Sequence, residues 1–131
     1  MAKYSDIDIE IEKLVFLENA YEGNPGIYEL TWELGHFELS IEDKYKIAHE
    51  LLVSLLTEEL VVLEKFAQLH SDKPIGIVDT RDIELVLNNP ASWYPCNEVY
   101  SIRLTDKGEE YLNNQSETNR AKLGDRIFGK K

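Results

Sequence analysis

The sequence has little cysteine, little histidine and no long apolar run. Its single cysteine, Cys96, cannot form a disulfide within the chain, which fits a reducing compartment. No apolar run approaches the roughly 18 residues that a helix needs to cross a bilayer. The opening segment, Met1–Asp6, also lacks the apolar core of a signal peptide. We therefore expect a cytoplasmic protein that neither spans nor binds a membrane.

Basic residues are scarce relative to acidic ones. The 131 residues include 25 Asp and Glu but 14 Lys and Arg, a net charge of −11. Residues 1–60 carry 14 acidic and 4 basic side chains, whereas residues 114–131 carry 2 acidic and 5 basic ones. An acidic body repels phosphate backbones and attracts basic protein surfaces, although acidity can also serve solubility alone. The charge thus indicates the sign of a partner and says nothing about the fold.

Length and composition predict one folded domain. With 43% hydrophobic and 30% charged residues, the chain is not a disordered acidic segment. A domain of this size buries roughly two-thirds of the surface of its unfolded chain. We place the domain at residues 1–113 and expect residues 114–131 to form a polar, basic C-terminal tail that is partly frayed.

Three helices are predicted in the first half. Ser5 can cap a helix that runs to Tyr21, although the alternation of Ile7, Ile9 and Ile11 also suits a strand. The turn at residues 23–26 breaks this helix, and a second helix extends from Ile27 to Gly35. Ser40 caps a third helix over residues 41–56, whose second half is apolar around most of its circumference. That helix should lie at the centre of the core.

The second half predicts two strands and two short helices. Residues 60–66 and 99–104 are rich in branched and aromatic side chains and should form strands, while residues 68–77 read as a loop. Asp79 or Thr80 can cap a short helix that Asn88-Asn89-Pro90 closes. Thr105 can cap a last helix that has an acidic first turn.

This order of elements resembles a winged helix-turn-helix. Residues 39–66 resemble a recognition helix followed by the first wing strand, and residues 100–112 resemble the second wing strand and the closing helix. The second stretch contains the Leu-Thr-x-x-Gly-x-x-x-Leu pattern that recurs in winged-helix families. The resemblance implies an α+β fold that is mainly α, winged-helix-like, with a small antiparallel β-hairpin or sheet.

Two departures weigh against DNA binding. The wing strands are separated by residues 67–98, a long insertion that contains a predicted helix. The helix at the recognition position carries Glu42, Asp43 and Glu50 against two lysines, and it has no Arg, Asn or Gln to read base edges. Nucleic acid is therefore not the expected partner, and fold resemblance alone does not transfer a function.

The acidic character and the Asn89-Pro90-x-x-Trp93 turn are similar to those of bacterial immunity proteins. Such proteins are paired with polymorphic or contact-dependent growth-inhibition toxins, many of which are nucleases with basic active sites. The resemblance implies a cytoplasmic inhibitor that binds and neutralises a basic toxin domain. The alternative is a winged-helix transcription regulator, or a relative of one that binds protein in place of DNA.

The residue pattern gives little support for catalysis. His36, His49 and His70 are isolated, and Cys96 has no histidine near it in sequence, so it reads as a packing residue. No glycine-rich phosphate-binding pattern is present. The acids near the N-terminus lack histidine or cysteine support for a metal. We expect no enzyme activity, no cofactor and no metal.

Candidate partner-binding residues come from the acids and aromatics. Trp93 and Tyr94 are candidate anchors, since aromatic side chains dominate interface energetics, but Trp93 could instead close the end of the core. Tyr28 and Trp32, four residues apart, carry the same two interpretations. The acids that we expect on the charged surface are Asp6, Asp8, Glu10, Glu12, Glu29 and Glu33.

Overall fold

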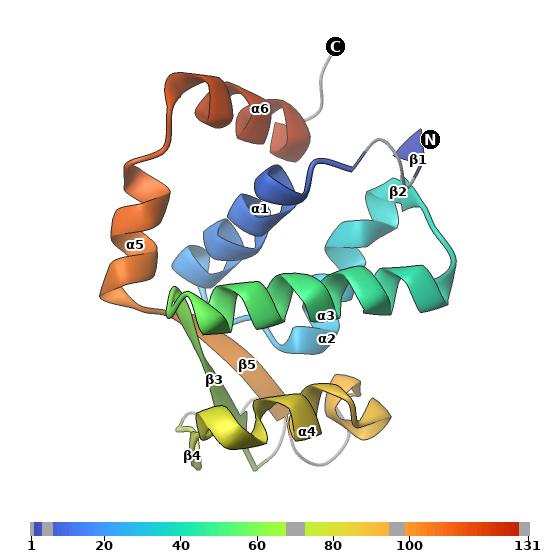
Figure 1. Cartoon of the computed structure of the whole chain (residues 1–131), viewed down its shortest axis with the longest axis vertical. Coiled ribbons are helices and arrows are strands. Elements are labelled where there is room, and N and C mark those ends of the chain that lie inside the picture. The colour runs from blue at the N-terminus through green and yellow to red at the C-terminus, as the bar shows by residue number, and fades with distance from the viewer. Residues whose placement is uncertain (1, 4–6, 68–72, 95–98, 129–131) are drawn as a thin grey trace.

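The chain folds into a mainly helical α+β structure with a small antiparallel sheet, as predicted. This computed structural model describes residues 2–3, 7–67, 73–94 and 99–128 (Figure 1). The helices are α1 (Ile9–Glu22), α2 (Ile27–Glu33), α3 (Ile41–Thr57), α4 (Ile83–Leu87), α5 (Asp106–Asn113) and α6 (Glu117–Phe128). The strands are β1 (Ala2–Lys3), β2 (Phe37–Glu38), β3 (Val61–Phe66), β4 (Gly76–Ile77) and β5 (Val99–Leu104). No described helix is long and apolar enough to span a membrane.

The helix α3 crosses the middle of the molecule, and its beginning was correctly predicted. The Ser40 hydroxyl accepts a hydrogen bond from the Asp43 amide at 3.1 Å, which satisfies one of the free amides of the first turn. The predicted core position of its second half is confirmed, but Ile41 in its first turn is 73% exposed. The buried residues of α3 are Ile47, Ala48, Leu51, Leu52 and Leu55.

The helix α1 is as central as α3, which its sequence did not indicate. Contacts with α3, α5, α6 and β5 surround it, so most of its circumference is buried. Its N-cap is Asp8, whose carboxylate accepts a hydrogen bond from the Ile11 amide at 3.4 Å; the predicted cap, Ser5, lies outside the described residues. The predicted break after Glu22 is confirmed, and α2 begins at Ile27.

The three-stranded sheet has the order β4-β3-β5, with both pairs antiparallel. The two strands predicted from sequence pair along their whole length, from Val61 opposite Leu104 to Phe66 opposite Val99. β4 falls in the segment that we predicted to be a loop. The separate parallel pair of β1 and β2 was also not predicted. Figure 1 shows the sheet and α4 at the opposite end of the molecule from α6.

The prediction that residues 114–131 form a partly frayed tail is wrong for most of that segment. Residues 117–128 form α6, which packs against α1, and the Ser116 hydroxyl accepts a hydrogen bond from the Asn119 amide at 3.1 Å. Leu123 of this helix is buried. A mostly polar segment can become ordered here because Arg126 forms an ion-pair network with the helical body.

Candidate partner-binding groove

A groove opens between the end of α1 and the outer side of α2. Its volume is about 480 Å³, and the turn between the two helices forms one wall. The residues that line it are Asn19, Glu22, Gly23, Asn24, Pro25, Glu29, Leu30, Trp32 and Glu33. These lining residues include three carboxylates and no lysine, arginine or histidine. The groove therefore combines a concave shape with a negative charge that no other lining residue offsets.

One of these acids also determines where α2 begins. Glu29 accepts a hydrogen bond from the Gly26 amide at 2.7 Å, which satisfies a donor in front of the first helical turn. Placing a carboxylate at this end of the helix is also favourable because the N-terminus carries partial positive charge. The Glu29 carboxylate is thus held in a fixed position at the groove, while Glu22 is exposed at the last position of α1.

An exposed indole stands beside these acids. Trp32 is 69% exposed, and the ring of Tyr28, one turn earlier, meets it edge to face with 5.6 Å between the ring centroids. Burial, and secondarily the charge of Glu29, raises the pKa of the Tyr28 hydroxyl above its usual value. Trp32 presents a large apolar surface to solvent.

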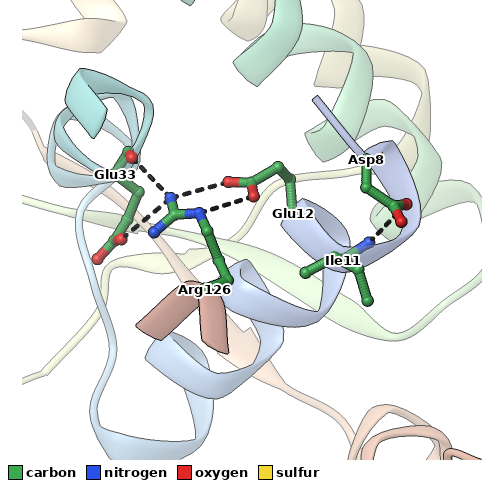
Figure 2. A network of polar contacts seen from close by, with 5 residues as sticks. All are labelled: Asp8, Ile11, Glu12, Glu33 and Arg126. Atoms are coloured by element: carbon green, nitrogen blue, oxygen red, sulfur yellow. Dashed lines mark hydrogen bonds and ion pairs between the residues drawn. The ribbon is translucent and has the colours of Figure 1, made fainter. Parts of the chain in front are cut away.

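Glu33 connects this groove to an ion-pair network at the edge of α6 (Figure 2). The Arg126 guanidinium donates two hydrogen bonds to the Glu12 carboxylate, at 2.8 and 2.9 Å, and a third to the main-chain oxygen of Glu33 at 2.8 Å. It lies 3.7 Å from the Glu33 carboxylate and 5.2 Å from the ring centre of Phe37. The consecutive helices α1 and α2 are thereby joined to α6, which is distant in sequence.

The prediction that Glu12 lies on the charged surface is wrong. Its side chain is 2% exposed, and the bidentate contact with Arg126 accounts for its burial, since a carboxylate is buried only when it is paired. Glu33 is partly buried and is oriented toward Arg126 on one side and the groove on the other. Among the predicted acids, the structure thus brings Glu29 and Glu33 together at one groove.

The acids near the N-terminus lie elsewhere. The Asp8 carboxylate caps α1 and is 3.9 Å from the Lys122 ammonium, and Glu10 accepts a hydrogen bond from the Tyr111 hydroxyl at 3.4 Å. Both face the side of α1 that α5 and α6 cover, and neither lines the groove. Asp6 lies outside the described residues. The single charged surface that we predicted is therefore divided.

The two predicted aromatic anchors have different environments. Trp93 is 5% exposed, its indole N–H donates a hydrogen bond to the Leu87 oxygen at 2.9 Å, and its ring packs against Tyr45. Trp93 therefore closes the core, as the second of its two interpretations predicts, and is not an anchor. Tyr94 is 59% exposed at a second pocket of about 530 Å³ between α3 and the Pro90–Trp93 turn. Tyr94 keeps the interpretation of an anchor.

Candidate metal ligands do not gather in the described part of the chain. Within it, no group of three or more His, Cys, Asp or Glu is arranged to hold a metal ion. His49 Nε2 is 3.5 Å from the Glu84 carboxylate and makes no hydrogen bond with the described residues. Cys96 and His70 lie outside those residues, so the structure gives no geometry for them.

Sequence reasoning missed Glu22 and Arg126 at this site and left Trp32 open between an anchor and a core residue. Trp32 lies off the apolar side of α2, which Ile27, Leu30 and Leu34 define, so the helical spacing alone already favoured exposure. Glu22 closes α1 directly before the glycine break, a position that is usually open to solvent. Arg126 gave no local signal, because its acidic partners are distant in sequence.

In comparisons with known proteins, no family model, no curated protein and no solved structure matches this chain. The resemblance to winged-helix immunity proteins therefore stays a prediction. What the chain can bind has to be inferred from its groove and its charge.

Proposed function

We propose that this protein is a cytoplasmic immunity protein that binds a basic toxin domain and neutralises it by covering its active surface. The observation that carries the proposal is the groove between α1 and α2, where Glu22, Glu29 and Glu33 surround the exposed Trp32. Interfaces commonly combine a large aromatic contact with complementary charge. The role is binding without turnover.

Charge is expected to control the rate at which the complex forms. A net charge of −11 attracts a cationic domain over several ångströms, and the acidic groove concentrates that attraction. Trp32 would be desolvated after contact, so it should influence mainly how long the complex lasts. An acidic surface of this kind is poorly suited to bind duplex DNA, since it repels the phosphate backbone.

The test uses the toxin domain encoded beside this protein's gene. Binding kinetics at low and high salt should be compared between the wild-type protein and the pair Glu22→Gln with Glu29→Gln. We expect the pair to slow association several-fold at low salt and to flatten its salt dependence, with a smaller change in dissociation. The matched control is Glu50→Gln with Asp82→Asn, which removes the same charge from exposed positions that do not line the groove.

Two results would contradict the proposal. One is a toxin activity that stoichiometric amounts of this protein leave unchanged. The other is sub-micromolar binding of duplex DNA that weakens steeply with added salt, which would restore the alternative of a transcription regulator. If the toxin is neutralised but the groove variants and the control behave alike, binding occurs on another surface.

A further inference from the structure

We infer that the groove receives an arginine side chain of the partner, which stacks on Trp32 and contacts the carboxylates of Glu33 and Glu29. This inference rests on the proposed function, because it names the side chain by which a basic partner would be recognised. It is argued from the way in which the same side of the molecule already holds a guanidinium of its own.

Arg126 shows how this region binds a guanidinium. Glu12 accepts two hydrogen bonds from it in a fork geometry, Glu33 contributes a main-chain oxygen, and Phe37 presents its ring at 5.2 Å (Figure 2). The site thus combines a carboxylate with an aromatic ring, which together match the planar, charged group. Arg126 is 12% exposed, so the guanidinium is largely desolvated.

The groove repeats this combination with no internal cation among its lining residues. Trp32 corresponds to Phe37 as the aromatic ring. Carboxylates around it come from Glu22, Glu29 and Glu33. Indole is the ring that attracts cations most strongly, and Trp32 is exposed enough to accept one on its face. Charge complementarity therefore favours a cationic side chain as the occupant.

Arg126 does not fully neutralise the charge of the Glu33 carboxylate. Its closest carboxylate contacts, at 2.8 and 2.9 Å, are with Glu12, whereas the Glu33 carboxylate is at the longer distance of 3.7 Å. The charge of Arg126 is thus balanced chiefly by Glu12, and the Glu33 carboxylate can accept hydrogen bonds from the groove side. The remaining acids of the groove offset repulsion between the two guanidinium groups.

Arginine suits this groove better than lysine does. A guanidinium is flat, stacks on an aromatic face and donates several hydrogen bonds in its own plane at the same time. An ammonium is a compact, strongly hydrated point charge that gains little from an exposed ring. A partner that inserts arginine would therefore bind more tightly than one that inserts lysine with the same charge.

The test compares two end-capped peptides, hexa-arginine and hexa-lysine, by titration against the full chain. We expect hexa-arginine to bind about two- to fivefold more tightly and to shift the indole NMR signal of Trp32. Trp32→Ala should remove this preference and leave weaker binding driven by charge. Phe128→Ala is the matched control, because it removes an exposed aromatic side chain that does not line the groove, and it should keep the preference.

Equal affinity for the two peptides, or a preference that survives in Trp32→Ala, would overturn the inference. Circular dichroism of the variant checks folding, which a change at so exposed a side chain should not alter. If the toxin is neutralised but the arginine preference is absent, the inference fails while the proposed function stands. If the preference is present but the toxin is not bound, the proposed function fails while the groove keeps its ligand.

Discussion

A β-carbon added to Gly108 would lie 2.0 Å from the main-chain oxygen of Leu60. The first turn of α5 is this close because the Leu60 oxygen accepts a hydrogen bond from the Thr105 amide at 3.1 Å and lies 3.0 Å from the Thr105 hydroxyl. The same hydroxyl accepts a hydrogen bond from the Gly108 amide at 2.9 Å and caps α5. The Thr-x-x-Gly portion of the sequence thus fastens α5 to the turn before β3.

The variant Gly108→Ala should therefore be strongly destabilised. The added carbon meets backbone and not a movable side chain, so α5 has to shift, and overpacking of this kind costs about 1–3 kcal/mol or more. Urea unfolding followed by circular dichroism measures the loss. Gly124→Ala in α6 is the control: nothing lies within 4 Å of its added carbon, and alanine favours a helix, so stability should stay equal or rise. Equal free energies of unfolding for the two variants would contradict the close packing of Gly108 against Leu60.

Truncation of Leu52 should destabilise the protein, because this residue of α3 lies in the core. Leu52 is completely buried, and Leu52→Ala should lower the free energy of unfolding by about 2–5 kcal/mol through lost burial and a remaining cavity. Ile41→Ala, in the exposed first turn of the same helix, should change it by less than about 0.5 kcal/mol. Chemical denaturation of both proteins tests the difference, and a loss below 1 kcal/mol at Leu52 would be incompatible with this core.

Removing the guanidinium that joins three helices should be costly. Arg126→Ala takes the bidentate partner from the buried Glu12 carboxylate, and breaking a buried ion pair from one side typically costs about 3–5 kcal/mol. Arg81→Ala is the matched control, because Arg81 forms a solvent-exposed pair with Asp79, and such pairs contribute about 0–1 kcal/mol. Hydrogen exchange should also show faster exchange across α6 in Arg126→Ala. Slow exchange there would mean that the other contacts of α6, including buried Leu123, are sufficient to hold the helix.

The contact between α1 and the end of α3 should make the free energy of unfolding depend on pH. The Lys13 ammonium donates a hydrogen bond to Glu58, which lowers the pKa of that carboxyl below its usual range despite the opposing effect of burial. A lowered folded-state pKa adds stability above the unfolded-state value, and this stability is lost as the pH falls through the folded-state pKa. Glu58→Gln should thus be less stable than wild type near neutrality, and the gap should close in acid. A gap that does not change with pH would exclude this linkage.

Sequence reasoning succeeded where the signal was local. The Ser40 and Thr105 caps each depend on a hydroxyl and an amide three residues later, so both helix starts could be read directly. Strands β3 and β5 are rich in branched and aromatic residues and were predicted for that reason. These elements account for the α3 core and for most of the sheet.

The elements that sequence reasoning missed depend on distant partners. α6 is largely polar, and its place on α1 involves a guanidinium and a carboxylate that no local periodicity connects. For the same reason Glu12 looked like one of several surface acids, although its neighbours in space bury it. The groove also required the structure, since the acids that line it come from both α1 and α2.

The contact between Glu12 and Arg126 spans 114 residues of chain, and this separation has a consequence for synthesis. When α1 leaves the ribosome, the guanidinium that compensates its buried carboxylate has not yet been made. The helical body can collapse once α2 and α3 have followed, but its ion-pair network closes only after α6 emerges. Products that terminate before Arg126 therefore lack the group that holds α1, α2 and α6 together, and the cell's proteases should remove them before they compete with the finished protein.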